Sequence, residues 1–134
     1  MTLLFDTNVC INLINGRASS RIAKRLRATS PSEIRLASIT RAELLFGAHK
    51  SAQVAENVRT VEQFCKPYLT LPFDDACAQH YGVVRAYLAR RGTPIGPNDL
   101  LIAATALAHD LTLVTHNVDQ FSRVVGLRIE DWEA

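Results

Sequence analysis

The chain has 134 residues, of which 48% are hydrophobic and 21% charged, with a formal net charge of +2. These values are typical of a soluble globular protein, and the length predicts a single domain over residues 1–134 without separate modules. No apolar run is long enough to span a bilayer, no basic region marks a signal peptide, and the small charge alone selects no partner.

Segments with strand and helix patterns alternate along the chain. Short strands are predicted over 2–5, 34–39, 68–73, 111–117 and 127–132. Helices are predicted over 8–15, 20–28, 40–50, 54–65, 75–90 and 100–109. Strands alternating with helices indicate an α/β fold with a mostly parallel sheet covered on both faces. In such sheets, functional sites form at the carboxyl ends of the strands.

The cysteines and histidines predict no metal site. Cys10, Cys65 and Cys77 are an odd number at wide spacing, which favours reduced, buried thiols in a cytoplasmic protein over disulfides or a zinc site. The four histidines are scattered, and no pair has metal-ligand spacing. Carboxylates and amides at the ends of strands therefore remain as the candidates for chemistry.

The first strand ends on a carboxylate, Asp6, followed by Thr7 and Asn8. One interpretation is structural: Asp6 or Asn8 caps the next helix by accepting hydrogen bonds from its free amides. For a lone aspartate in this position, capping is the simpler interpretation. The position also lies at the edge of the sheet where sites form, so a functional role stays open.

Two further acids have the same ambiguity. Thr40 and Glu43 match the capping-box pattern, in which Thr40 caps a helix and Glu43 reaches back to it. Asn98 or Asp99 would cap the most apolar helix of the chain. A helix buried on all sides also draws its first-turn carboxylate inward, where a charge is costly unless something compensates it.

The stretch after the strand at 111–117 offers Thr115, Asn117 and Asp119, either as a polar loop or as part of a site. Taken together, acidic and amide groups follow several strand ends at one edge of one sheet. Carboxylates that lie close together repel unless a cation sits among them. Mg²⁺ and Mn²⁺ accept oxygen ligands and lower the pKa of a bound water, so the pattern predicts metal-dependent phosphodiester chemistry.

Four blocks resemble the successive blocks of a PIN domain, and more narrowly of the VapC ribonuclease toxins of bacterial toxin–antitoxin pairs. They are "LLFDTNV", "SITRAELLFGA", "PNDLLIAATAL" and "LTLVTHNVDQFSRVVGLRIEDW". The resemblance covers essentially the whole chain. It implies a three-layer α/β/α sandwich with a parallel sheet, and an acidic pocket that binds Mg²⁺ or Mn²⁺ and hydrolyses RNA.

The resemblance also implies the roles of individual residues. The first three acids of the family fall on Asp6, Glu43 and Asp99, which are the expected metal ligands. The fourth acid of many PIN domains falls on Asn117, so either Asn117 or Asp119 takes that position, and whether one metal ion or two binds stays open. Two residues beside these positions are expected to hydrogen-bond to them: Thr7 and Thr115.

Partners follow from the same resemblance. It implies cleavage of structured RNA, with initiator tRNA in its anticodon stem–loop as the suspected substrate. It implies a homodimer, and an antitoxin whose C-terminal segment covers the pocket, often with an arginine among the carboxylates. The cut site, the dimer face and the antitoxin are not specified.

Two groups of basic residues are candidates for RNA binding. Arg90 and Arg91 precede the loop that leads to Asp99. A second group is predicted to share one helical face, which could hold an RNA backbone or simply be a solvated surface: Arg17, Arg21, Lys24 and Arg25.

Two alternatives compete with a nuclease. One is a catalytically silent PIN-like module that binds RNA or a protein partner, which the departure at Asn117 favours. The other is a phosphohydrolase of the haloacid dehalogenase type. That class needs a second carboxylate two residues after the first, and Asn8 stands there. The three acids favour the nuclease over the silent module, and Asn8 argues against the phosphohydrolase.

Overall fold

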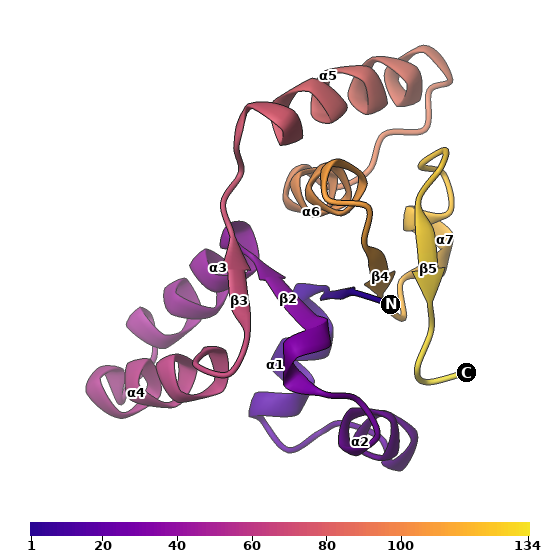
Figure 1. The fold of residues 1–134 in the computed structure, drawn as a ribbon. Coiled ribbons are helices and arrows are strands. Elements are labelled where there is room, and N and C mark those ends of the chain that lie inside the picture. Colours follow the sequence, from indigo (N-terminus) through magenta and orange to yellow (C-terminus); the bar gives the residue numbers. More distant parts are fainter.

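In the computed structural model, which describes residues 1–134, five strands form one sheet in the order β3-β2-β1-β4-β5, and every neighbouring pair is parallel (Figure 1). The strands are β1 (Leu3–Phe5), β2 (Ile34–Ala37), β3 (Leu69–Leu71), β4 (Thr112–Val114) and β5 (Arg128–Glu130). The helices are α1 (Thr7–Ile14), α2 (Ser20–Arg27), α3 (Ser38–His49), α4 (Val54–Cys65), α5 (Asp75–Arg90), α6 (Pro97–Ala108) and α7 (Val118–Phe121). The predicted parallel α/β fold is confirmed.

Helices cover both faces of the sheet, which makes three layers (Figure 1). Side chains of α1, α2, α3 and α4 form a core on one face, into which β1 directs Leu3 and Phe5. Side chains of α5, α6 and α7 form a core on the other face, which receives Leu4. Because successive strand residues point to opposite faces, the three apolar residues of β1 contribute to both cores.

The middle strand of the sheet is β1. The chain passes from β1 to β2 on one side and later reaches β4 on the other, so the strand order reverses beside β1. Ligands of open parallel sheets bind at such a point, beyond the carboxyl ends of the strands. The backbone amide of Asp6 donates to the Val114 carbonyl at 3.1 Å, which joins the residue after β1 to the last residue of β4.

Helix α3 starts earlier than predicted. Strand β2 ends at Ala37, and the Ser38 hydroxyl donates to the Leu71 carbonyl of β3 at 2.9 Å, which anchors the first residue of α3 at the sheet edge. Thr40 consequently lies inside α3 and is fully buried, and no side chain caps the start of this helix. The predicted capping box of Thr40 and Glu43 is therefore wrong.

Helix α6 also starts earlier than predicted. It begins at Pro97, because proline has no amide hydrogen to leave unpaired and fits the first turn of a helix. Gly96 precedes the helix, and no side-chain hydrogen bond caps it. Asn98 and Asp99 lie within the first turn, so the predicted capping by either of them is wrong.

The remaining differences are smaller. The strands predicted over 68–73, 111–117 and 127–132 are shorter in the structure, and the short helix α7 stands where the sequence predicted only a polar loop. The helix at the start of the chain is capped as expected, by Asp6. No helix has the length and apolar character needed to cross a membrane.

Candidate active site

Side chains from four parts of the fold line one cavity of about 790 Å³. Asp6 follows β1, Glu43 lies on α3, Asp99 lies in the first turn of α6, and Asn117 follows β4. Three of these positions lie beyond the carboxyl ends of β1, β2 and β4, and α6 brings the fourth to the same edge. The fold therefore gathers the four residues from segments that are far apart in the sequence.

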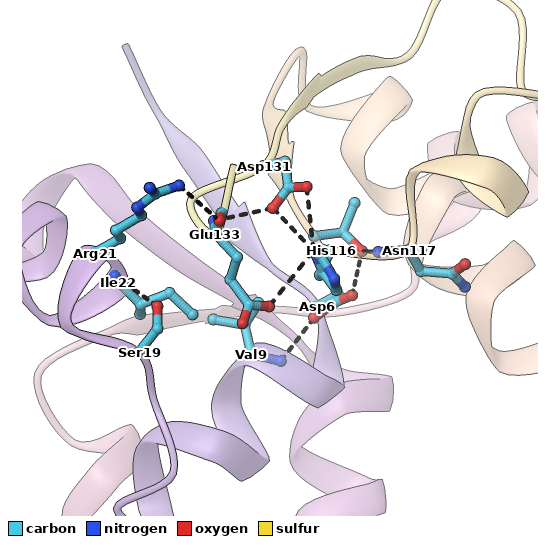
Figure 2. Close-up of polar contacts among 10 residues, drawn as sticks. Asp6, Val9, Ser19, Arg21, Ile22, His116, Asn117, Asp131 and Glu133 are labelled. Atoms are coloured by element: carbon cyan, nitrogen blue, oxygen red, sulfur yellow. Dashed lines mark hydrogen bonds and ion pairs between the residues drawn. The ribbon is translucent and has the colours of Figure 1, made fainter.

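Asp6 both caps a helix and lines the cavity. Its Oδ1 accepts a hydrogen bond from the Val9 amide at 2.8 Å, and its Oδ2 accepts one from the Thr115 hydroxyl at 2.5 Å (Figure 2). The side chain is only 3% exposed. Burial raises the pKa of Asp6 above its ordinary value despite these two hydrogen bonds, and the negative charges of Glu133 and Glu43 raise it further.

Glu43 is oriented by the helix that follows β1. The Thr7 hydroxyl, in the first turn of α1, donates to Glu43 Oε1 at 2.7 Å. The same hydroxyl oxygen lies 3.1 Å from the buried hydroxyl of Thr40, one turn before Glu43. Thr7 therefore links α1 to α3 and directs the Glu43 carboxylate towards the side of the cavity that holds Asp6.

Asp99 is half-buried at the start of α6. Burial raises the pKa of Asp99, and the charges of Asp6 and Glu43 raise it further. The three carboxylates thus lie close enough to repel one another. Removing this repulsion requires a proton or a cation between them.

The fourth position of the site is held by Asn117. Asn117 lines the cavity. Its backbone N–H donates to the Thr115 hydroxyl oxygen at 3.0 Å, and its side-chain Nδ2 lies 3.5 Å from Gln120 Oε1. Asp119 is exposed on α7 and does not line the cavity. The structure therefore brings Asn117, and not Asp119, to the three acids.

The donor set fits a hard divalent cation. Three carboxylates and a carboxamide supply only oxygen ligands and the negative charge that such an ion balances. The oxygens of Asp6, Glu43 and Asp99 do not all lie within 4.8 Å of one another. One ion would therefore be bound through waters to some of these carboxylates, as Mg²⁺ commonly is, or would draw the carboxylates closer together.

The sequence did not predict a group of ionisable residues that lies beside Asp6. His116 Nδ1 lies 3.1 Å from Asp131 and 3.7 Å from Glu133, both of which follow β5 (Figure 2). Hydrogen bonding to Asp131 raises the pKa of His116, whose side chain is 68% exposed. The signal was the run of acidic residues at the end of the last predicted strand, because β5 ends at the same sheet edge as β1 and β4.

None of the six basic candidates lines the cavity. Arg17 precedes α2, so the prediction that it shares a helical face with the others is wrong. Arg25 pairs with Glu130 at 2.9 Å and lies over the Trp132 ring at 5.0 Å, while Arg21 donates to the Glu133 carbonyl at 3.4 Å.

The other basic candidates have fewer contacts. Lys24 is exposed on α2. Arg90 ends α5, and Arg91 follows it with its guanidinium 5.4 Å from the centre of the Tyr87 ring. Both arginines are exposed, at the start of the loop that leads to Asp99.

Comparison with known proteins agrees with this geometry. The family model of the PIN domain matches residues 3–127. The tRNA(fMet)-specific endonuclease VapC of Salmonella typhimurium is 40% identical over 132 residues, 98% of each chain. Ribonuclease VapC2 of Rickettsia felis is 35% identical over 133 residues, 99% of each chain.

Solved structures agree as well. The DNA-bound VapBC crystal structure from Salmonella typhimurium superimposes with a TM-score of 0.92 at 39% identity, over 98% of each chain. The identity over nearly the whole length, the matching fold and the acidic cavity all lead to one assignment. The chain belongs to the PIN-domain family, among the VapC ribonucleases.

Proposed function

We propose that this protein is a metal-dependent endoribonuclease toxin that hydrolyses phosphodiester bonds in structured RNA. The observation that carries the proposal is the cavity itself, which Asp6, Glu43 and Asp99 line together. Burial raises the pKa values of Asp6 and Asp99, and the charges of neighbouring carboxylates raise them further. Neighbouring carboxylates with no positive charge among them favour the binding of a cation. The relatives of this chain are named as an endonuclease and a ribonuclease.

Mg²⁺ or Mn²⁺ is the proposed cofactor, held by Asp6, Glu43 and Asp99. When bound there, such an ion neutralises charge on the phosphodiester and makes a nearby water more acidic. The protein's own groups hold the ligands in place. Thr115 and the Val9 amide fix both oxygens of Asp6, Thr7 fixes Glu43, and the Asn117 carboxamide is placed to orient a water.

Initiator tRNA is the proposed substrate, cut in its anticodon stem–loop. The support is the Salmonella typhimurium relative, whose name specifies tRNA(fMet) and which is 40% identical. The exposed Arg90 and Arg91 are candidates for contacts to the RNA backbone.

We also propose a cognate VapB-type antitoxin whose C-terminal segment covers the cavity, and a cytoplasmic homodimer as the toxin unit. Beside its acids, the cavity has an apolar flank that includes Ile11, Ile39 and the largely exposed Phe46. A peptide with an arginine and apolar residues would complement both parts. The similar solved structure from Salmonella typhimurium is a VapBC complex.

Cleavage of total tRNA by the purified protein tests the proposal. We expect discrete fragments with Mg²⁺ or Mn²⁺, none with EDTA, and none from Asp99→Asn. Glu56→Gln is the matched control, because Glu56 also lies in the first turn of a helix but is exposed and outside the cavity. Equal cleavage by Asp99→Asn would assign the activity to another site or a contaminant.

The same experiment tests the silent RNA-binding module that the Asn117 departure favours. A silent module binds tRNA without cutting it under any metal condition. Tight binding with no fragments from the wild-type protein would therefore replace the nuclease proposal by this alternative.

A further inference from the structure

A second group of metal-ligating side chains lies where α5 begins and α6 ends. Asp74 caps α5, Cys77 lies in the first turn of that helix, and His109 follows the last residue of α6. A carboxylate oxygen, the Cys77 sulfur and an imidazole nitrogen all lie within 4.8 Å of one another. None of the three residues lines the cavity of the candidate active site.

One buried nitrogen of His109 lacks a hydrogen-bond partner. Its Nε2 is the one buried side-chain nitrogen or oxygen of the protein without a hydrogen bond. Buried polar atoms nearly always have a partner, because an unpaired one loses its hydration without compensation. His109 therefore has a ring nitrogen free for a ligand that the protein does not itself supply.

The other two side chains are already oriented. The Cys77 amide donates to Asp74 Oδ1 at 3.1 Å, which holds the carboxylate beside the Cys77 side chain. The Cys77 sulfur makes a long contact of 3.8 Å to the Pro72 carbonyl. Cys77 is buried and Asp74 is exposed, so an ion can enter from the side of Asp74.

We propose that Asp74, Cys77 and His109 bind a zinc ion, with water as the fourth ligand. Zinc takes thiolate, imidazole and carboxylate ligands in tetrahedral sites, and the thiolate disfavours Mg²⁺. Bonds of roughly 2.0–2.3 Å place tetrahedral ligands about 3.5 Å apart, so the three atoms need only a small approach. Bound zinc joins the start of α5 to the end of α6.

Co²⁺ is the best probe, because it replaces zinc and a thiolate ligand gives it an intense near-ultraviolet charge-transfer absorption. Carboxylate sites, including the candidate active site, give no such band. The full-length Asp99→Asn protein is suitable, since that substitution weakens the other divalent site. We expect the band to saturate at one equivalent of Co²⁺ and to disappear when zinc is added, because zinc binds such ligands more tightly.

Single substitutions assign the ligands. Cys77→Ser should abolish the band, and His109→Gln should weaken Co²⁺ binding by on the order of tenfold or more. Cys65→Ser is the matched control, because Cys65 is a buried thiol in the core on the other face of the sheet, and it should retain the band. Circular dichroism establishes that each variant is folded.

Two results would overturn the proposal. One is a wild-type chain that shows no thiolate band at saturating Co²⁺. The other is a band that survives in folded Cys77→Ser or is unchanged in folded His109→Gln, because either would place the ion elsewhere. An unfolded Cys77→Ser leaves His109→Gln to decide.

Discussion

Asp6 both caps α1 and brings a buried charge to the cavity, and these two roles respond differently to substitution. Asparagine keeps an oxygen that can accept from the Val9 amide but removes the charge. Because burial raises the pKa of Asp6, the ionised form destabilises the metal-free protein at neutral pH. We expect Asp6→Asn to lose tRNA cleavage while its free energy of unfolding stays equal or rises by on the order of 1 kcal/mol.

Urea unfolding and the cleavage assay check this prediction together. Asp6→Ala is the informative comparison, because it removes the cap as well and leaves the Val9 amide and the Thr115 hydroxyl without their acceptor. It should be less stable than Asp6→Asn by about 1 kcal/mol. An Asp6→Asn protein that is inactive because it unfolds would show that the carboxylate itself is structural.

Thr115 acts on the reaction through Asp6, as a positioning residue. Its hydrogen bond lowers the pKa of Asp6, in opposition to the larger effect of burial. Thr115→Val removes that donor, so the pKa of Asp6 rises and the acid limb of the pH profile of kcat/KM moves to higher pH. We expect cleavage at neutral pH to fall roughly ten- to hundredfold.

Thr115→Ser keeps the hydroxyl and should restore both the rate and the pH profile. The measurement is kcat/KM for tRNA cleavage at several pH values for the three proteins. A uniform loss at every pH, with no shift of the acid limb, would mean that Thr115 only supports the local fold, for example through the Asn117 amide.

At the scale of elements, helix α2 places two of its basic residues, Arg21 and Arg25, against the C-terminal segment. Both Arg25 and Lys24 are exposed, but only Arg25 stacks on Trp132 and pairs with Glu130. We expect Arg25→Ala to lower the free energy of unfolding by on the order of 1 kcal/mol, chiefly through the lost stacking, since exposed ion pairs contribute little. Lys24→Ala should change it by less than about 0.5 kcal/mol.

Thermal melts and the salt dependence of tRNA binding separate the two roles considered for this helix. If α2 holds RNA, both substitutions reduce the salt slope of binding, because each removes a phosphate contact. A structural role of Arg25 predicts a lower Tm with an unchanged salt slope. Equal melts for the two variants would contradict the packing role.

The elements also show how far the sequence could be interpreted alone. Alternating strand and helix patterns predicted the parallel sheet, because β1, β2 and β3 are short strand-like runs, each followed by a helix pattern. The capping-box pattern was misleading because four residues cannot reveal where β2 ends, and the true helix start at Ser38 is tied to β3. Helix α7 is a single turn, too short to show a helical period.

The sequence could predict a site residue that comes shortly after a strand, as Asp6 and Asn117 do. Hydrogen bonding by Thr7 and Thr115 to the site was expected, but not which carboxylate each would reach: Thr7 donates to Glu43 of another helix, and Thr115 donates to Asp6. The Asp131 and Glu133 carboxylates reach His116 only because β5 lies beside β4. Such pairings depend on the three-dimensional fold, which spacing along the chain does not encode.

For the whole molecule, the cavity couples stability to pH. The folded-state pKa values of Asp6 and Asp99 lie above their ordinary value of 3.8. Between that value and the raised ones, the folded protein binds more protons than the unfolded chain. These two groups therefore make the metal-free protein less stable as pH rises through this window, and more stable as pH falls through it.

A divalent cation should reverse this trend, because it binds the ionised carboxylates and not the protonated ones. We expect Mg²⁺ or Mn²⁺ to raise the Tm of the wild-type protein at neutral pH, and less so at acid pH. At a hundredfold excess over the dissociation constant, the stabilisation is about 2.7 kcal/mol. Asp99→Asn should lose most of it while Glu56→Gln keeps it, in melts with EDTA as the reference. A shift of equal size in Asp99→Asn would mean that the stabilising ion binds outside the cavity, and the three carboxylates would then need another explanation for their assembly.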